Sequence, residues 1–180
     1  SGNPPVFIGF GSNPVHDPER INQLLSDVAN STSQRFIISK GWAGLQTAEG
    51  NNNCLYVDEV PYELLFPKVS VAVHHGGTGT MAAAAKAGIP QIAFPFMADQ
   101  FQNSAQLVKL GLGPKTCDFK KMTAAILSDA ILKCILHEGY KIRAKEIANR
   151  IKGIDGLRMT YKLIEDELME KMQKDIFKDT

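Results

Sequence analysis

The 180-residue sequence has few cysteines and no motif that would make them structural. Its three cysteines, Cys54, Cys117 and Cys134, are far apart in the chain. None belongs to a CxxC pair or to a Cys/His spacing typical of zinc ligands. We therefore expect ordinary buried or half-buried thiols, with no disulfide framework and no metal site.

Long apolar runs are also lacking, and so is an excess of charge of one sign. No stretch approaches the roughly 18 to 20 uninterrupted apolar residues of a membrane-spanning helix, and the chain does not begin with a secretion signal. The formal net charge of +1 gives no electrostatic reason to expect nucleic acid as a partner. These absences favour a cytoplasmic protein that does not bind nucleic acid.

The composition does supply enough apolar residues for a folded core. Apolar residues make up 44% of the chain and charged residues 22%, which argues against a disordered protein. Domains contain roughly 100 to 200 residues. We therefore expect residues 1–180 to form a single domain, or a large part of a bigger protein.

Two kinds of hydrophobic pattern alternate along the chain. Short continuous apolar runs are typical of strands buried in a parallel sheet, and apolar positions three or four residues apart are typical of helices. The runs that predict strands lie at 6–10, 35–39, 55–57, 71–73 and 91–94, and a weaker sixth strand is expected near 113–117. The spacing predicts helices at 17–28, 61–67, 78–87, 99–108, 123–136, 144–151 and 157–172. This order predicts an α/β fold: a Rossmann-like parallel sheet of about six strands with helices on both faces, ending in C-terminal helices.

The densest group of glycines and polar residues follows the strand at 71–73. It reads His74-His75-Gly76-Gly77-Thr78-Gly79-Thr80. Glycines let backbone amides approach a ligand, and the first amides of a helix have no partner within the helix and lie at the positive end of its dipole. We predict a phosphate site here, to which Thr78 and Thr80 add hydroxyl donors and one histidine adds another hydrogen bond. A tight turn whose histidines cap the sheet edge is the alternative.

Motifs of other phosphate and hydrolase sites are missing. The first strand is not followed by GxGxxG, and the second does not end in an acidic residue, so no dinucleotide site is predicted. GxxxxGK[ST] and GxSxG are also absent, which argues against a P-loop and a serine hydrolase.

Two further loops follow strands and would lie at the same edge of the sheet. Gly11 and Ser12, after the first strand, offer flexible backbone and a hydroxyl, or else form a plain turn. Asp99 and Gln100, after the fifth strand, suit the vicinal hydroxyls of a sugar, because a carboxylate accepts hydrogen bonds and an amide both accepts and donates them. Asp99 also suits the cap of the following helix. A phosphate loop and a hydroxyl-binding loop together predict a nucleotide sugar as ligand.

Four motifs occur in the order seen in sterol glucosyltransferases. They are Ser39-Lys40-Gly41-Trp42, Val57-Asp58-Glu59-Val60-Pro61 with Leu65-Phe66-Pro67, the turn at 74–80, and Pro95-Phe96-Met97-Ala98-Asp99-Gln100. Through them the chain resembles, from Phe10 through at least Gly113, the nucleotide-binding half of the wider UDP-glycosyltransferase family. The resemblance implies the GT-B fold, in which two Rossmann-like domains face a cleft. This chain would be the C-terminal domain alone, with the N-terminal acceptor domain absent from it.

The resemblance also implies which residues bind the donor. His75 and the turn at 76–80 would hold the diphosphate together with Ser12. Asp99 and Gln100 would hold the transferred hexose. The full implied donor-binding set is Gly11, Ser12, Trp42, Val60, His75, Gly76, Gly77, Thr78, Gly79, Thr80, Asp99 and Gln100.

Recognition of the nucleoside is only partly implied. The backbone of Val60 would hold uracil, and Trp42 would lie near the base, with a place in the core as its alternative. Thr78, Gly79 and Ala83 stand where flavonoid-type plant relatives have tryptophan, asparagine and a ribose-binding glutamate. Ribose binding is therefore not assigned, and neither is the choice between UDP and dTDP.

The implied function is that of the donor-binding domain of an inverting, metal-independent glycosyltransferase. It would move a hexose, glucose from UDP-glucose, to a hydroxyl of a lipid-like acceptor such as a sterol, with transient membrane contact. No cofactor is expected besides the UDP-sugar substrate, and the general base would belong to the N-terminal acceptor domain, so this domain alone would be inactive. Asn13 and Ala98 depart from the sterol enzymes. The alternatives are a natural-product enzyme using a dTDP-sugar and a non-catalytic nucleotide-binding or partner-binding subunit.

Overall fold

The computed structural model describes residues 2–15, 17–41, 45 and 53–176, and the side chains among them up to Lys171. The chain divides into two compact units, Ser1–Arg150 and Ile151–Thr180, which are described separately.

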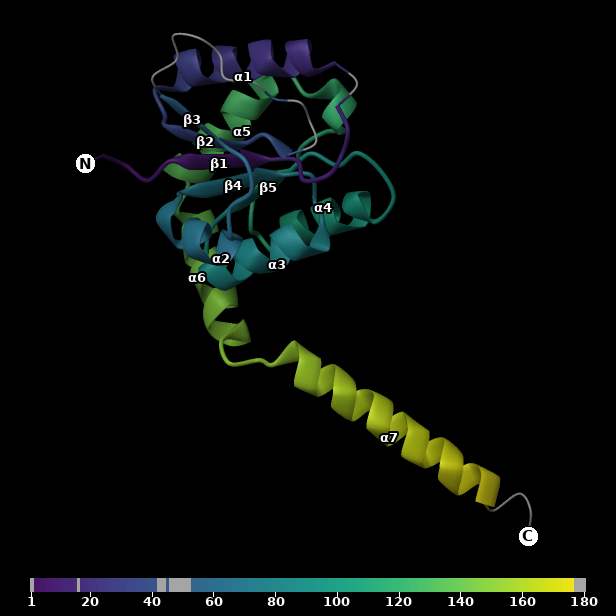
Figure 1. The fold of residues 1–180 in the computed structure, drawn as a ribbon. Helices are drawn as coiled ribbons and strands as arrows, with labels where there is room; N and C mark the ends of the chain where they lie inside the picture. Colours follow the sequence, from purple (N-terminus) through teal and green to yellow (C-terminus); the bar gives the residue numbers. More distant parts are fainter. Residues whose placement is uncertain (1, 16, 42–44, 46–52, 177–180) are drawn as a thin grey trace. The chain divides into compact units, whose positions relative to one another are not determined.

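The first unit is built around a parallel sheet that has five strands among the described residues (Figure 1). The strands are β1 (Val6–Gly9), β2 (Phe36–Ser39), β3 (Cys54–Val57), β4 (Val71–His74) and β5 (Gln91–Ala93). They lie in the order β3-β2-β1-β4-β5, and all four pairings are parallel. The carboxyl ends of the strands therefore share one edge, and the chain changes direction across the sheet between β1 and β4, where ligands bind in such folds.

Helices cover both faces of the sheet, as predicted. On one face lie α1 (Pro18–Thr32) and α5 (Ala124–Leu136), and on the other lie α2 (Tyr62–Leu65), the 3-10 turn η2 (Phe66–Lys68) and α3 (Thr78–Ala87). Beside β5 lie α4 (Asp99–Lys109) and α6 (Glu138–Ile151), and a second 3-10 turn, η3 (Phe119–Lys121), precedes α5.

The burial of β1 on both faces of the sheet explains why its sequence is a continuous apolar run. Val6 and Ile8 pack in the cluster that includes α1 and α5, whereas Phe7 packs with Phe66 on the opposite face. Successive side chains of a strand point to opposite faces, so a strand covered on both faces needs an apolar residue at every position.

The predicted sixth strand at 113–117 is not formed. Hydrogen bonds tie this part of the chain to β5 only at intervals: the Gln91 amide donates to the Leu112 carbonyl (2.9 Å), and the Thr116 hydroxyl donates to the Ala93 carbonyl. Pro114 has no amide hydrogen to continue a ladder. The segment also lacks a continuous apolar run, so the sheet has five strands among the described residues and not the predicted six.

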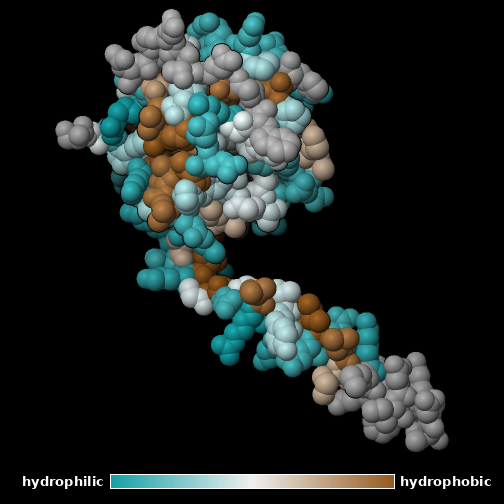
Figure 2. All heavy atoms as spheres, in the orientation of Figure 1, coloured by the Kyte–Doolittle hydropathy of each residue, from teal (hydrophilic) through white to brown (hydrophobic). Residues whose placement is uncertain are grey.

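The second unit contains the helix α7 (Gly156–Ile176). Its predicted apolar stripe forms at helical spacing but is exposed: Leu157, Tyr161, Ile164 and Leu168 are all more than half exposed. Figure 2 shows apolar residues interspersed with hydrophilic ones along this helix. Within the described part of the chain, no helix combines the length and apolar character needed to cross a membrane.

Candidate functional site

The imidazole of His75 lies between two glycine-containing loops at the carboxyl edge of the sheet. A Cβ atom at Gly11 would come within 2.9 Å of His75 Cε1, and one at Gly77 would overlap Nε2 of the same ring. Side chains at these two positions would displace the ring, and Gly11 also has a positive φ of 62°. The structure therefore brings together three of the predicted donor-binding residues, Gly11, His75 and Gly77, from the loops after β1 and β4.

His75 has unused hydrogen-bonding capacity. Its Nδ1 atom is buried and has no hydrogen-bond partner among the described residues. Burial lowers the pKa of His75 below its usual value, and the Asp99 carboxylate partly opposes this change. The ring is therefore neutral near pH 7 and carries one N–H that can donate to an anion.

The neighbouring His74 has a different environment. It is completely buried, and its Nδ1 accepts a hydrogen bond from the amide of Gly76 (2.9 Å). Its Nε2 lies 3.0 Å from Oε1 of Gln91 on β5. The amide of Gly76 is thus directed into the protein, although the turn at 76–80 was predicted to offer its amides to phosphate. His74 and Gln91 were not among the predicted site residues, because their contact spans two strands.

The helix α3 begins directly after the glycine turn. Gly77 is its N-cap, without a side-chain capping bond, and the amides that follow are the unpaired first amides of a helix. Thr78 and Gly79 are exposed, so their amides and the Thr78 hydroxyl are accessible. Thr80 is buried, and its side chain is hydrogen-bonded to Tyr62. The predicted phosphate donor Thr80 thus joins α3 to α2 instead.

In the loop after β5, the two residues predicted to bind the sugar, Asp99 and Gln100, have different environments. Asp99 is the first residue of α4, and Ala98 holds the cap position, so Asp99 is not the cap that its residue type suggested. The Asp99 carboxylate is exposed and accepts from the Asn103 amide (3.2 Å). Gln100 is buried, with its Oε1 accepting from the Phe96 amide (2.8 Å). Asp99 is open to a ligand, whereas Gln100 holds its own loop in place.

Ala98 adopts a backbone conformation that suits glycine, with φ 47° and ψ −127°. This conformation strains any residue with a Cβ. We expect Ala98→Gly to raise the free energy of unfolding by about 1 kcal/mol, measured from the urea midpoint at unchanged slope. Ala105→Gly, at an exposed interior position of the same helix, is the control and should lower it by a similar amount. A lower midpoint for Ala98→Gly would show that this loop is not strained.

A pocket of about 550 Å³ lies beside this site, at the ends of β1, β2 and β3 and next to α2. Its lining residues are Gly11, Ser12, Ser39, Gly41, Asp58, Glu59, Val60 and Tyr62. The pocket therefore includes three of the predicted donor-binding residues, Gly11, Ser12 and Val60. Lys40 forms an ion pair with Asp58 at its border (3.2 Å). Trp42 lies outside the described residues.

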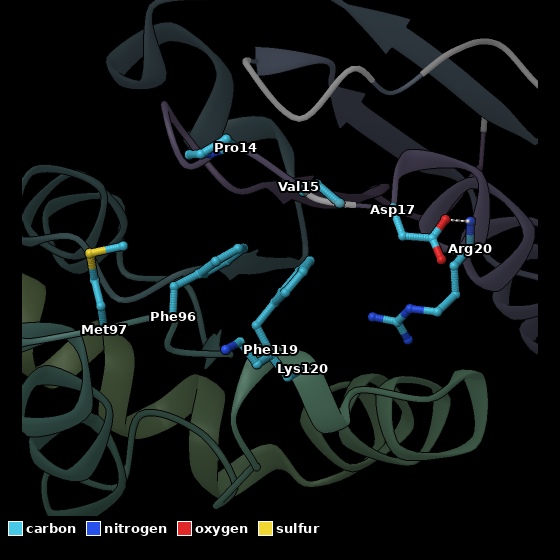
Figure 3. A pocket seen from close by; sticks show the side chains of 8 residues that line it. All are labelled: Pro14, Val15, Asp17, Arg20, Phe96, Met97, Phe119 and Lys120. Atoms are coloured by element: carbon cyan, nitrogen blue, oxygen red, sulfur yellow. Dashed lines mark hydrogen bonds between the residues drawn. The ribbon is translucent and has the colours of Figure 1, made fainter.

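A second pocket, of about 560 Å³, lies next to a later part of the loop after β1, at Pro14 and Val15 (Figure 3). Its lining residues are Pro14, Val15, Asp17, Arg20, Phe96, Met97, Phe119 and Lys120. The rings of Phe96 and Phe119 stack at 3.9 Å, and the guanidinium of Arg20 points toward the same space. This largely apolar pocket was not predicted, because segments about 80 and 100 residues apart meet to form it.

The cysteines behave as predicted. Cys54 and Cys117 are half-buried and Cys134 is buried, and all three are free thiols. Burial raises the pKa of each thiol, that of Cys134 to about 12, so these thiols are not activated nucleophiles. The described residues contain no group of three histidine, cysteine or acidic side chains arranged to hold a metal ion.

Comparison with known proteins relates this chain to a family. Residues 22–153 match the family model described as erythromycin biosynthesis protein CIII-like, C-terminal domain. A sterol 3-beta-glucosyltransferase of Arabidopsis thaliana is 37% identical over 158 residues, which are 87% of this chain and 26% of the relative. The vancomycin aglycone glucosyltransferase of Amycolatopsis orientalis is 35% identical over 166 residues, which are 92% of this chain and 40% of that protein.

A solved structure of similar fold is that of the kitacinnamycin glycotransferase. Its TM-score is 0.75 at 19% identity, and the match covers 92% of this chain and 43% of that one. The chain thus spans less than half the length of each of these proteins. By sequence and by fold, the chain belongs to the erythromycin biosynthesis protein CIII-like C-terminal domain family of GT-B glycosyltransferases.

Proposed function

We propose that this chain is the donor-binding half of a two-domain glycosyltransferase that uses a UDP-sugar. The observation that carries the proposal is the place of His75, between Gly11 and Gly77 and directly before α3. The polar pocket that includes Val60 lies on one side of this centre, and the exposed Asp99 lies near His75. Uridine would bind in the pocket, the diphosphate at the start of α3, and the hexose at Asp99.

The chemistry follows from the charge that develops on the leaving group. Inverting transfer breaks the bond between the anomeric carbon and UDP while an acceptor hydroxyl attacks from the opposite face. Negative charge grows on the diphosphate, where the first amides of α3, its dipole and the neutral His75 would stabilise it without a metal ion. The base that deprotonates the acceptor would belong to an N-terminal domain, so the chain alone should bind donor without transferring its sugar.

The acceptor we propose is a lipid-like alcohol, most simply a sterol. Two observations support it: the 37% identity to a sterol glucosyltransferase, and the apolar pocket around Phe96 and Phe119 next to the loop that leads to Asp99. The protein would then act in the cytoplasm with transient contact to membranes. The 35% identity to a vancomycin aglycone glucosyltransferase supports the second candidate, a natural-product enzyme.

Calorimetric titration of the chain with UDP, dTDP and UDP-glucose tests the donor assignment. We expect UDP and UDP-glucose to bind, each more tightly than dTDP. ADP is the control, and it should bind at least tenfold more weakly than UDP if the pocket at Val60 selects the base. Tighter binding of dTDP would favour the natural-product alternative, and a folded chain that binds none of these ligands would contradict the proposed function.

A further inference from the structure

A continuous chain of buried polar groups lies beneath the glycine turn. Two side chains form it, His74 on β4 and Gln91 on β5, which are 0% and 1% exposed. Nε2 of Gln91 donates to the carbonyl of Met81 in α3 (3.3 Å), and Oε1 of Gln91 faces Nε2 of His74 (3.0 Å). Nδ1 of His74 accepts from the amide of Gly76 (2.9 Å). Hydrogen bonds therefore connect α3, both strands and the turn.

These contacts determine where the proton of His74 lies. Nδ1 can accept the Gly76 hydrogen only when it carries no proton of its own, so the proton of the neutral ring is on Nε2 and is donated to Gln91. The pKa of His74 is lowered to about 4, chiefly by burial; the hydrogen bond to Gln91 opposes this change, and the nearby His75 adds to it. The neutral ring that this arrangement requires is thus the form present at pH 7.

Gly76 is held on both sides of its Cα. His74 accepts from its amide, and the side chain of Asn103 on α4 donates to its carbonyl (2.8 Å). Its φ of 89° lies in the region that glycine adopts readily and other residues rarely do. A Cβ there would lie 3.1 Å from the carbonyl oxygen of Gln100. The orientation of this residue sets the direction in which the chain enters α3, and with it the direction of the amides that follow.

We propose that His74, supported by Gln91, is a positioning residue for the donor site: it fixes the Gly76 peptide so that His75 and the first amides of α3 face the same ligand. The inference rests on the proposed function, because it assigns His74 a part in binding the diphosphate. In this role His74 does not itself contact the ligand. A buried histidine that only satisfies its own hydrogen bonds would affect stability but not the affinity of the folded chain.

Two nearly isosteric variants separate these roles. The Oδ1 of asparagine can occupy the place of Nδ1, so His74→Asn keeps an acceptor for the Gly76 amide, whereas His74→Leu has none. We expect His74→Leu to weaken UDP-glucose binding at least tenfold, and His74→Asn to stay within about threefold of wild type. Amide hydrogen exchange, followed by NMR, should be slow at Gly76 in the wild type and in His74→Asn and fast in His74→Leu.

The outcomes that overturn the proposal are distinct from failure of the proposed function. Wild-type affinity in folded His74→Leu overturns it, as does equal loss in both variants while the asparagine variant still protects Gly76. If His74→Leu does not fold, Gln91→Met tests the same chain from its other end. It should weaken binding severalfold and speed exchange at Gly76, and no change in either would overturn the proposal. A wild-type chain that does not bind UDP-glucose refutes the proposed function. Fast amide exchange at Gly76 in the wild-type chain refutes the proposal that His74 fixes the Gly76 peptide.

Discussion

His75→Ala is expected to weaken UDP-glucose binding by about 10- to 100-fold. The expectation follows from the loss of a hydrogen-bond donor to a charged ligand, which is worth roughly 1.5 to 3 kcal/mol. The ring also fills the space between Gly11 and Gly77, so its removal leaves a gap at the centre of the site. Calorimetric titration of the folded variant against the wild-type chain measures the change.

His75→Phe distinguishes the donor from the filled space. Phenylalanine keeps a ring between the two glycines but cannot donate, so it should lose nearly as much affinity as alanine. The pH dependence gives a second measurement. The bound diphosphate would favour protonated His75, so wild-type affinity should rise as the pH falls from about 8 to about 6, and His75→Phe should not show this rise. Wild-type affinity in His75→Phe would mean that the ring acts by packing alone.

Gly113→Ala is expected to destabilise the chain by about 3 kcal/mol or more. A Cβ at this position would overlap the carbonyl oxygen of Gln91 and lie 3.0 Å from the carbonyl carbon. Both are backbone atoms of the buried strand β5, so relief requires the segment after Leu112 to move away from β5 and to break the hydrogen bond between the Gln91 amide and the Leu112 carbonyl. The free energy of unfolding in urea gives the measurement.

Gly139→Ala is the matched control for this substitution. Gly139 lies in α6, and a Cβ there would meet nothing within 4 Å. Alanine is the better helix former, so the control should be more stable than the wild type by about 0.5 to 1 kcal/mol. If Gly113→Ala were as stable as the control, the close approach of this segment to β5 would not exist in solution.

The fold could be predicted because burial leaves a direct trace in the sequence. Strands covered on both faces must be apolar at every position, and helices covered on one face must be apolar every three or four residues. The order of these patterns therefore indicated a parallel sheet with helices on both faces. The sixth strand expected near 113–117 is absent because this segment, Gly-Pro-Lys-Thr-Cys, has no run of apolar residues to bury and Pro114 has no amide hydrogen for a ladder.

That the loops of the candidate site meet at one edge of the sheet could be predicted for a similar reason. Loops that follow parallel strands meet at one edge, so the turns at Gly11 and Gly77 and the loop at Asp99 were expected to lie together. The contacts of His75 with both glycines agree with that expectation. Residue types also indicated a ligand with phosphate and hydroxyl groups, since glycine-rich helix starts and carboxylates suit those groups.

Local patterns in the sequence were thus enough to predict the order of elements, the edge that carries the candidate site and the family. The direction in which individual polar groups face depends on the folded chain. It directed His74 and Gly76 inward, joined Thr80 to Tyr62, buried Gln100 against its own loop and left Asp99 exposed. The reason is that local patterns record burial, whereas a hydrogen bond such as that between His74 and Gln91 depends on a partner 17 residues away that only the paired strands bring within reach.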